Sequence, residues 1–99
     1  MAEKQTFLTA VWSETWKESY AALSADRQRL CDQSAIALIK RESSSGLRIK
    51  PIQPDKYYLE ARLNSGDRIV FRIGGGTIYF IDVVKHDDID RYGRRPRAR

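Results

Sequence analysis

The spacing of apolar residues changes from helical to strand-like near residue 47, and this change limits the fold more than any other feature of the chain. Before it, Cys31, Ala35, Leu38 and Ile39 recur at i, i+4, i+7 and i+8, the spacing of one helix face. After it, apolar and polar residues alternate, as at residues 59–63, which is the pattern of a half-buried strand. The order predicts an α+β fold with helices packed on one face of a sheet.

One strand is predicted ahead of the helices. Residues 6–12 carry apolar side chains on both faces, which favours a central strand. Ser13 and Ser24 are suited to cap two successive helices, the second of which reaches about Arg41 before a break at residues 43–46. Because almost nothing separates the two helices, they are predicted to form an antiparallel hairpin.

The second half of the chain predicts an antiparallel meander, so the whole sheet has four to five strands. The predicted strands are residues 47–50, 58–63, 68–73 and 77–84. Turns are expected at residues 64–67 and 74–76, and Pro51 ends the first of these strands or keeps it at an edge. Asp87 or Asp88 is suited to cap a final helical turn that runs toward Tyr92.

Several aromatic and sulfur-containing side chains could be taken for ligand-binding residues but are assigned to the core. Trp12, Trp16 and Tyr20 recur every four residues, which favours core packing on an amphipathic helix. The only cysteine, Cys31, is expected to be a small buried residue. With one histidine and one cysteine the chain lacks the ligands of a catalytic zinc site, and no metal or other cofactor is expected.

Positive charge is concentrated at the end of the chain. The 99 residues carry a net charge of +5, and four arginines lie among the last six residues. Removing these four leaves 14 basic and 13 acidic residues, a net charge of +1. We therefore expect one domain over residues 1–93 and a basic tail over 94–99 that contacts nucleic acid or an acidic partner, or is a solvated end without function.

No segment of the chain favours a membrane or secretion. No apolar run approaches the ~20 residues that span a bilayer, and the polar start does not match a signal peptide. A cytoplasmic protein without membrane contact is expected.

Basic residues and the only histidine gather at positions suited to RNA chemistry. Arg62 and Arg68 flank the first turn and should be neighbours, a repulsive arrangement unless Glu60 or a phosphate neutralises it. His86 follows a buried strand, between Lys85 and, further on, Tyr92. Cleavage of RNA without a metal needs a proton acceptor for the 2′-hydroxyl, a donor for the leaving 5′-oxygen, and cations for the phosphate. Histidine and arginine supply these groups at neutral pH.

Two segments, residues 58–72 and 81–92, resemble the RelE/ParE toxin superfamily. The first resembles the family's hairpin, in which an arginine followed by two aliphatic residues and an aromatic opens the second strand. The second resembles its terminal strand, a His-Asp-Asp ending and a tyrosine. The resemblance covers most of the chain and implies a compact RelE-like domain that acts as an endoribonuclease on mRNA at the ribosome. It also implies a cognate antitoxin as partner and a toxin–antitoxin hetero-oligomer.

The resemblance also implies roles for individual residues. Arg68 would stabilise the phosphate in the transition state, His86 would be the catalytic histidine, Tyr92 would orient or stack on substrate, and Lys85 would support phosphate binding. Glu60 departs from the family, because the strongest ribonucleases tend to carry a basic group there. The expected RNA-binding residues are basic: Arg48, Lys50, Arg62, Arg72, Arg94 and Arg95.

Two other functions stay open. The superfamily includes toxins that inhibit DNA gyrase by binding, without enzymatic activity, although that branch generally lacks the combined arginine, histidine and tyrosine set. An RNA- or ribosome-binding module that uses the arginine tail is the other alternative.

Overall fold

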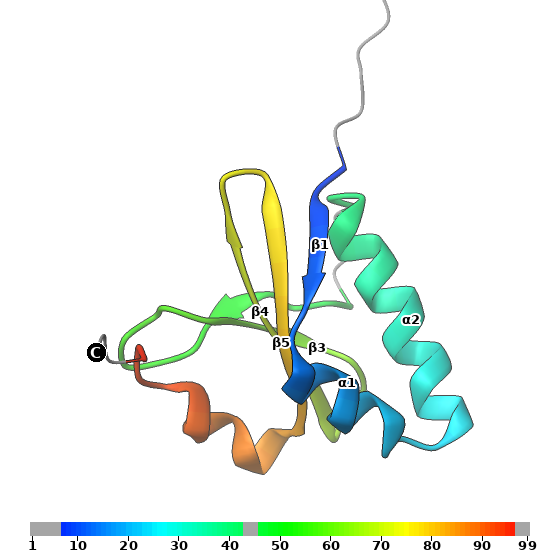
Figure 1. Cartoon of the computed structure of the whole chain (residues 1–99). Coiled ribbons are helices and arrows are strands. Elements are labelled where there is room, and N and C mark those ends of the chain that lie inside the picture. Colours follow the sequence, from blue (N-terminus) through cyan, green and yellow to red (C-terminus); the bar gives the residue numbers. More distant parts are fainter. Residues whose placement is uncertain (1–6, 43–45, 97–99) are drawn as a thin grey trace, which may run out of the picture.

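The computed structural model describes residues 7–42 and 46–96 and has the predicted α+β architecture (Figure 1). Five strands form one sheet in the order β1-β5-β4-β3-β2, in which β1 and β5 are parallel and the other neighbours are antiparallel. The elements, in chain order, are β1 (Thr9–Trp12), α1 (Glu14–Ala21), α2 (Ala25–Ile39), β2 (Lys50–Pro51), β3 (Leu59–Arg62), β4 (Asp67–Gly74), β5 (Thr77–Lys85) and the 3₁₀ helix η1 (His86–Tyr92).

Both predicted helix starts are confirmed. Ser13 Oγ accepts a hydrogen bond from the Trp16 N–H at 2.9 Å, and Ser24 Oγ accepts one from the Arg27 N–H at 3.4 Å. Ser13 also donates to the Ile81 carbonyl at 2.6 Å, which ties the start of α1 to β5. Helix α2 ends at Ile39 rather than near Arg41; the break predicted at 43–46 lies mostly outside the described residues.

The prediction of a central first strand is wrong, because β1 is an edge strand. Among the described strands it pairs with β5 alone, and three of its four residues are exposed, Trp12 by 38%. The central positions belong to the longer β4 and β5, which pair along nearly their whole length. Apolar residues on both faces of a strand therefore do not identify a central strand when the neighbouring hairpin is longer.

The other edge of the sheet is also shorter than predicted. Only Lys50–Pro51 forms β2, because Arg48 has a positive φ of 45° that interrupts the extended backbone. Pro51 lies at the edge, as predicted. The final helix differs too: η1 begins at His86 after Lys85, and no side chain caps it, so neither Asp87 nor Asp88 is its cap.

The two predicted turns are confirmed, and each has a clear cause. Asn64 Oδ1 accepts hydrogen bonds from the N–H groups of Gly66 and Asp67, both at 2.8 Å, which closes the turn between β3 and β4. Gly75 and Gly76 have φ angles of 58° and 78°, the left-handed pair that a tight two-residue hairpin requires.

The main core lies between the sheet and the two helices, as predicted. Trp16 from α1 and Cys31, Ala35 and Leu38 from α2 pack on Phe71, Phe80 and neighbouring apolar residues of the sheet. Burial raises the pKa of the Cys31 thiol to about 12, so this group stays protonated at neutral pH. No helix in the described ranges is long and apolar enough to cross a bilayer.

A smaller apolar cluster covers part of the opposite sheet face. Val70 and Val84 of the sheet are covered by Ile52, with Tyr58 and Tyr92 packed around them. The segment that follows β5 and the segment between β2 and β3 therefore fold over this face. The remainder of that face carries the candidate site.

Candidate nucleic-acid interface

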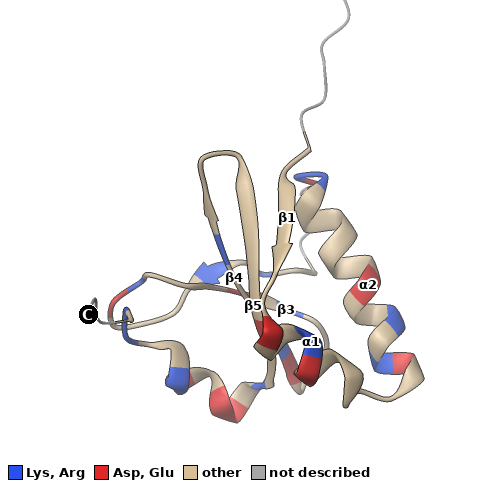
Figure 2. Ribbon diagram, viewed as in Figure 1, with Lys and Arg blue, Asp and Glu red and all other residues tan. Residues whose placement is uncertain are grey.

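Basic side chains line the sheet face that the helices leave open. Strand alternation and register place Lys50, Glu60, Arg62, Arg68 and Arg72 on this face, because the intervening Ala61, Ile69 and Phe71 point into the helix-side core. Figure 2 shows basic positions on β2, on β4 and in the C-terminal segment. This face has two ends, the turn between β3 and β4 and the region where β4 leads to the Gly75–Gly76 turn.

At the first end, Arg62 and Arg68 are direct partners across β3 and β4, as predicted. Arg68 Nε lies 3.6 Å from Glu60 Oε1, so the carboxylate offsets this pair of like charges. Arg68 Nη1 also donates to the carbonyls of Asn64 at 2.8 Å and Asp67 at 3.0 Å. The Arg68 side chain is only 14% exposed. Arg68 is therefore not a free surface arginine: it helps to hold the turn.

His86 lies at the same end of the sheet. Its N–H donates to the Gly66 carbonyl at 2.8 Å, which fixes the start of η1 against the β3–β4 turn. Its side chain is 56% exposed, and Nδ1 lies 3.5 Å from Asp87 Oδ1. The backbone of His86 is thus fixed next to the turn that carries Arg68, and its imidazole is accessible to a ligand.

Lys85 is adjacent to His86 in sequence but lies on the helix side. It is the cross-strand partner of Asp67 and lines a hollow together with Arg27 of α2. Arg27 donates to both oxygens of Asp67, from Nε at 2.8 Å and from Nη2 at 2.6 Å. These hydrogen bonds lower the pKa of Asp67. The structure therefore separates Lys85 from Arg68 by the thickness of the sheet.

The Tyr92 hydroxyl donates a hydrogen bond to Asp82 Oδ2 inside the fold. Asp82 is 2% exposed and also accepts from Ser19 Oγ of α1 at 2.5 Å and from the Val83 N–H at 2.8 Å. Burial, followed by the hydrogen bond to Asp82, raises the pKa of Tyr92 well above its usual range. Tyr92 thus anchors η1 to the sheet and to α1.

Sequence reasoning missed the role of Asp82, although one signal was present. An acid in the middle of an apolar strand needs buried partners. The register shift of β5 opposite Val70 and Phe71 marks the same point in the sheet, where Val70 faces Asp82. No group of three His, Cys, Asp or Glu side chains in the described ranges is placed to hold a metal ion.

Among the predicted RNA-binding residues, Arg62 lies at the first end of the face, opposite Arg68. Arg48, Lys50 and Arg94 are exposed, and Arg72 and Arg95 both lie over the ring of Tyr57 at the second end. Tyr57 was not predicted; its signal is a tyrosine pair, Tyr57-Tyr58, directly after a lysine. Arg97 and Arg99, which belong to the predicted tail, lie outside the described residues.

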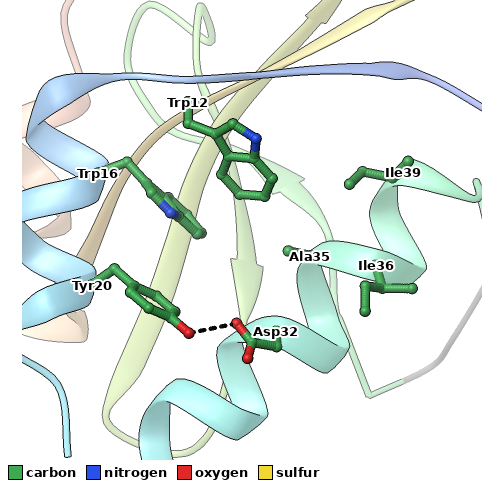
Figure 3. A pocket seen from close by; sticks show the side chains of 7 residues that line it. All are labelled: Trp12, Trp16, Tyr20, Asp32, Ala35, Ile36 and Ile39. Carbon is green, nitrogen blue, oxygen red and sulfur yellow. Dashed lines mark hydrogen bonds between the residues drawn. The ribbon is translucent and has the colours of Figure 1, made fainter.

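A separate hollow of about 350 Å³ lies on the helix side, between β1, α1 and α2 (Figure 3). Trp12, Trp16, Ile36 and Ile39 supply most of its wall, and Tyr20 Oη donates to Asp32 Oδ1 at 2.8 Å on one side of it. The predicted aromatic stripe is therefore only partly core, since Trp16 is buried and Trp12 is not. This lining is suited to apolar contact, and its two polar side chains, Tyr20 and Asp32, bind each other.

No family model matches the chain, and no curated protein matches it by sequence. Solved structures do match. The E. coli DinJ–YafQ toxin–antitoxin complex gives a TM-score of 0.69 at 14% identity, over 81% of this chain and 93% of the other. The Methanococcus jannaschii RelB–RelE complex gives 0.65 at 18%, over 83% and 96%. A mutant toxin from Helicobacter pylori gives 0.69 at 9%, over 82% and 97%. The expected fold is confirmed: this chain has the fold of RelE- and YafQ-type toxins.

Proposed function

We propose that this protein is the toxin of a toxin–antitoxin pair and acts as a metal-independent, ribosome-dependent endoribonuclease on mRNA. The observation that supports this proposal most is the site at the β3–β4 turn on a RelE-like fold. There Arg62 and Arg68 lie side by side, and the backbone N–H of His86, whose imidazole is half-exposed, donates to the Gly66 carbonyl of the same turn. This end of the sheet joins phosphate-binding groups to a group that exchanges protons at neutral pH.

The proposed reaction is attack by a ribose 2′-oxygen on the adjacent phosphorus. The 2′-hydroxyl loses its proton to a base, the bond from phosphorus to the 5′-oxygen breaks, and the leaving oxygen takes up a proton. The products are a 2′,3′-cyclic phosphate and a 5′-hydroxyl. His86 is the proposed proton-transfer group, because Glu60 is 6% exposed and already faces Arg68.

The cations have different parts in this proposal. Arg62 binds the phosphate, and Arg68, held by the turn, contributes a fixed positive charge beside it. Lys85 adds positive potential from the helix side without touching the phosphate. Tyr92 holds η1, and so His86, in place through Asp82.

The proposal includes the partners implied by the fold. The cognate antitoxin is the expected protein partner, in a hetero-oligomer, and the substrate is mRNA on the ribosome. The net charge of +5 suits both an RNA substrate and an acidic partner. The place of action would be the cytoplasm, where translation occurs.

The test is a reconstituted translation reaction in which mRNA 5′ ends are mapped by primer extension. The protein should produce new ends within the translated region, and none on mRNA without ribosomes. His86→Gln should lower the rate on the order of 10²-fold. Arg29→Gln removes an exposed arginine of α2 that pairs with Asp26 on the helix surface, and should cleave like the unmodified protein. Equal rates for His86→Gln and Arg29→Gln would refute the role of His86.

One observation favours a binding toxin of the gyrase-inhibiting kind as the second candidate. Arg68 and Tyr92 both have their polar groups engaged inside the fold. Intact mRNA together with lost DNA supercoiling in a gyrase assay would establish that function. Intact mRNA with normal supercoiling and salt-dependent RNA binding would instead establish a plain RNA-binding module.

A further inference from the structure

Four residues from three separate segments meet at the second end of the open face. Lys56 and Tyr57 precede β3, Arg72 lies on β4, and Arg95 follows η1. These residues, named here the Tyr57 cluster, line a hollow of about 350 Å³ together with Asp55. None of them belongs to the site proposed for cleavage.

The cluster is held by backbone contacts between the chain's C-terminal segment and the segment before β3. The Arg95 N–H donates to Asp55 Oδ2 at 2.6 Å, and the Asp55 N–H donates to the Gly93 carbonyl at 2.9 Å. A Cβ at Gly93 would lie 2.5 Å from the Gln53 carbonyl oxygen, so only glycine permits this approach. These contacts fix the position of the Arg95 backbone, independently of the conformation of its side chain.

The arrangement concentrates positive charge on an aromatic ring. The guanidinium carbons of Arg72 and Arg95 lie 4.5 Å and 4.7 Å from the centroid of the Tyr57 ring. Within the described ranges, no carboxylate forms a salt bridge with either arginine or with Lys56, and an Asp55 oxygen is used by a backbone N–H. Three cations near one acid repel one another, and an anion bound among them would relieve the repulsion.

The chemistry of the cluster selects a nucleotide over a simple anion. Arginine binds phosphate oxygens in pairs, and arginine and tyrosine both present planar faces on which a base can stack. Arg72 and Arg68 lie four residues apart on one face of one strand, about 13 Å at strand spacing. An RNA strand that passes over Ile52 and Tyr58, which cover Val70 between these two arginines, would therefore meet both ends of the face.

We propose that the Tyr57 cluster is a second RNA subsite, which binds a nucleotide flanking the cleaved phosphate through its phosphate and its base. The subsite rests on the proposed function for its role in cleavage but binds RNA on its own account. The subsite extends the RNA interface away from His86. It also assigns Arg95, at the start of the arginine tail, a position in that interface.

Binding is measured first, by fluorescence anisotropy of a short labelled oligouridylate over a range of salt concentrations. Arg72→Gln and Arg95→Gln should each weaken binding and reduce the slope of log affinity against log salt by about 0.7. Tyr57→Leu should weaken binding at least about fivefold with little change in slope. Arg29→Gln, with the same change in charge on α2, should leave affinity and slope unaltered. Urea unfolding of each variant confirms that it is folded, and Arg95→Gln keeps the backbone contact to Asp55.

The result separates this proposal from the proposed function. If the cluster variants lose binding and His86→Gln does not, the subsite stands even where no cleavage is seen in translation. If the unmodified protein cleaves mRNA while cluster variants match Arg29→Gln in binding, salt slope and cleavage sites, the subsite is refuted and the endoribonuclease is not.

Discussion

Arg68 and Arg72 lie on the same strand and the same face, yet the fold uses them in different ways. Arg68 is nearly enclosed, with Nη1 on turn carbonyls and Nε facing Glu60. Arg72 lies over two aromatic rings, 4.5 Å from Tyr57 and 5.9 Å from Tyr79. A guanidinium that donates to backbone carbonyls has used its N–H groups within the fold. A guanidinium that lies over aromatic rings still has N–H groups that can donate to a ligand. The difference separates a cation required by the fold from one available for binding.

The largest expected effect is on folding at the enclosed arginine. Arg68→Ala leaves turn carbonyls and the buried Glu60 without their partner, and should lower the free energy of unfolding by about 2–3 kcal/mol. Arg72→Ala should cost less than about 1 kcal/mol, as expected for a half-buried cation–π contact near the surface. Urea denaturation of both variants measures the difference. Equal losses of unfolding free energy in the two variants would show that the fold does not use Arg68 and Arg72 differently.

Two tyrosines extend the comparison. Tyr92→Phe removes the hydroxyl that binds Asp82 and should cost about 1.5 kcal/mol, while Tyr57→Phe should cost less than about 0.5 kcal/mol. The raised pKa of Tyr92 means that its stabilisation is present below the usual tyrosine pKa near 10 and is lost as pH rises above it. Unfolding measured up to alkaline pH should therefore show a steeper decline for the unmodified protein than for Tyr92→Phe.

The last comparison concerns the helix side of the β3–β4 turn. Asp67 binds Arg27, and its lowered pKa means that its stabilisation is present above about pH 3.8 and is lost as pH falls below that value. Asp67→Asn should cost less than about 1 kcal/mol near neutral pH, since the Arg27 side chain is 34% exposed and water screens the pair. Its stability should also fall less on acidification. An unchanged acid profile would show that the turn is held from the open face alone.

The sequence predicted the parts of the fold that depend on local pattern. Helical spacing around Cys31, the capping Ser13 and Ser24, and both turns are all found in the structure. Position within the sheet was harder to predict, because it depends on the lengths of strands far apart in the chain. The apolar residues before Ser13 therefore indicated a strand correctly and its central place wrongly.

For the candidate site, the sequence predicted which residues are neighbours but not which groups surround each side chain. The Arg62–Arg68 pairing follows from the turn between them and is confirmed. The enclosure of Arg68 depends on backbone carbonyls, which no residue pattern displays. The contact of Arg95 with Tyr57 joins segments that share no sequence signal, since the course of the chain after η1 brings them together. The catalytic and RNA-binding roles stay predictions.

The parallel pairing of β1 with β5 has a consequence for how the chain is made. Thr9 pairs with Thr77, and α1 packs on β5, so the N-terminal helices meet their sheet only after most of the chain exists. Closing such a long loop is slow, and until then the apolar face of Trp16 has no cover. A shortened product that ends before β5 would hold neither His86 nor a closed sheet. His86 therefore reaches the β3–β4 turn only once β5, the strand that joins β1 to β4, is in place.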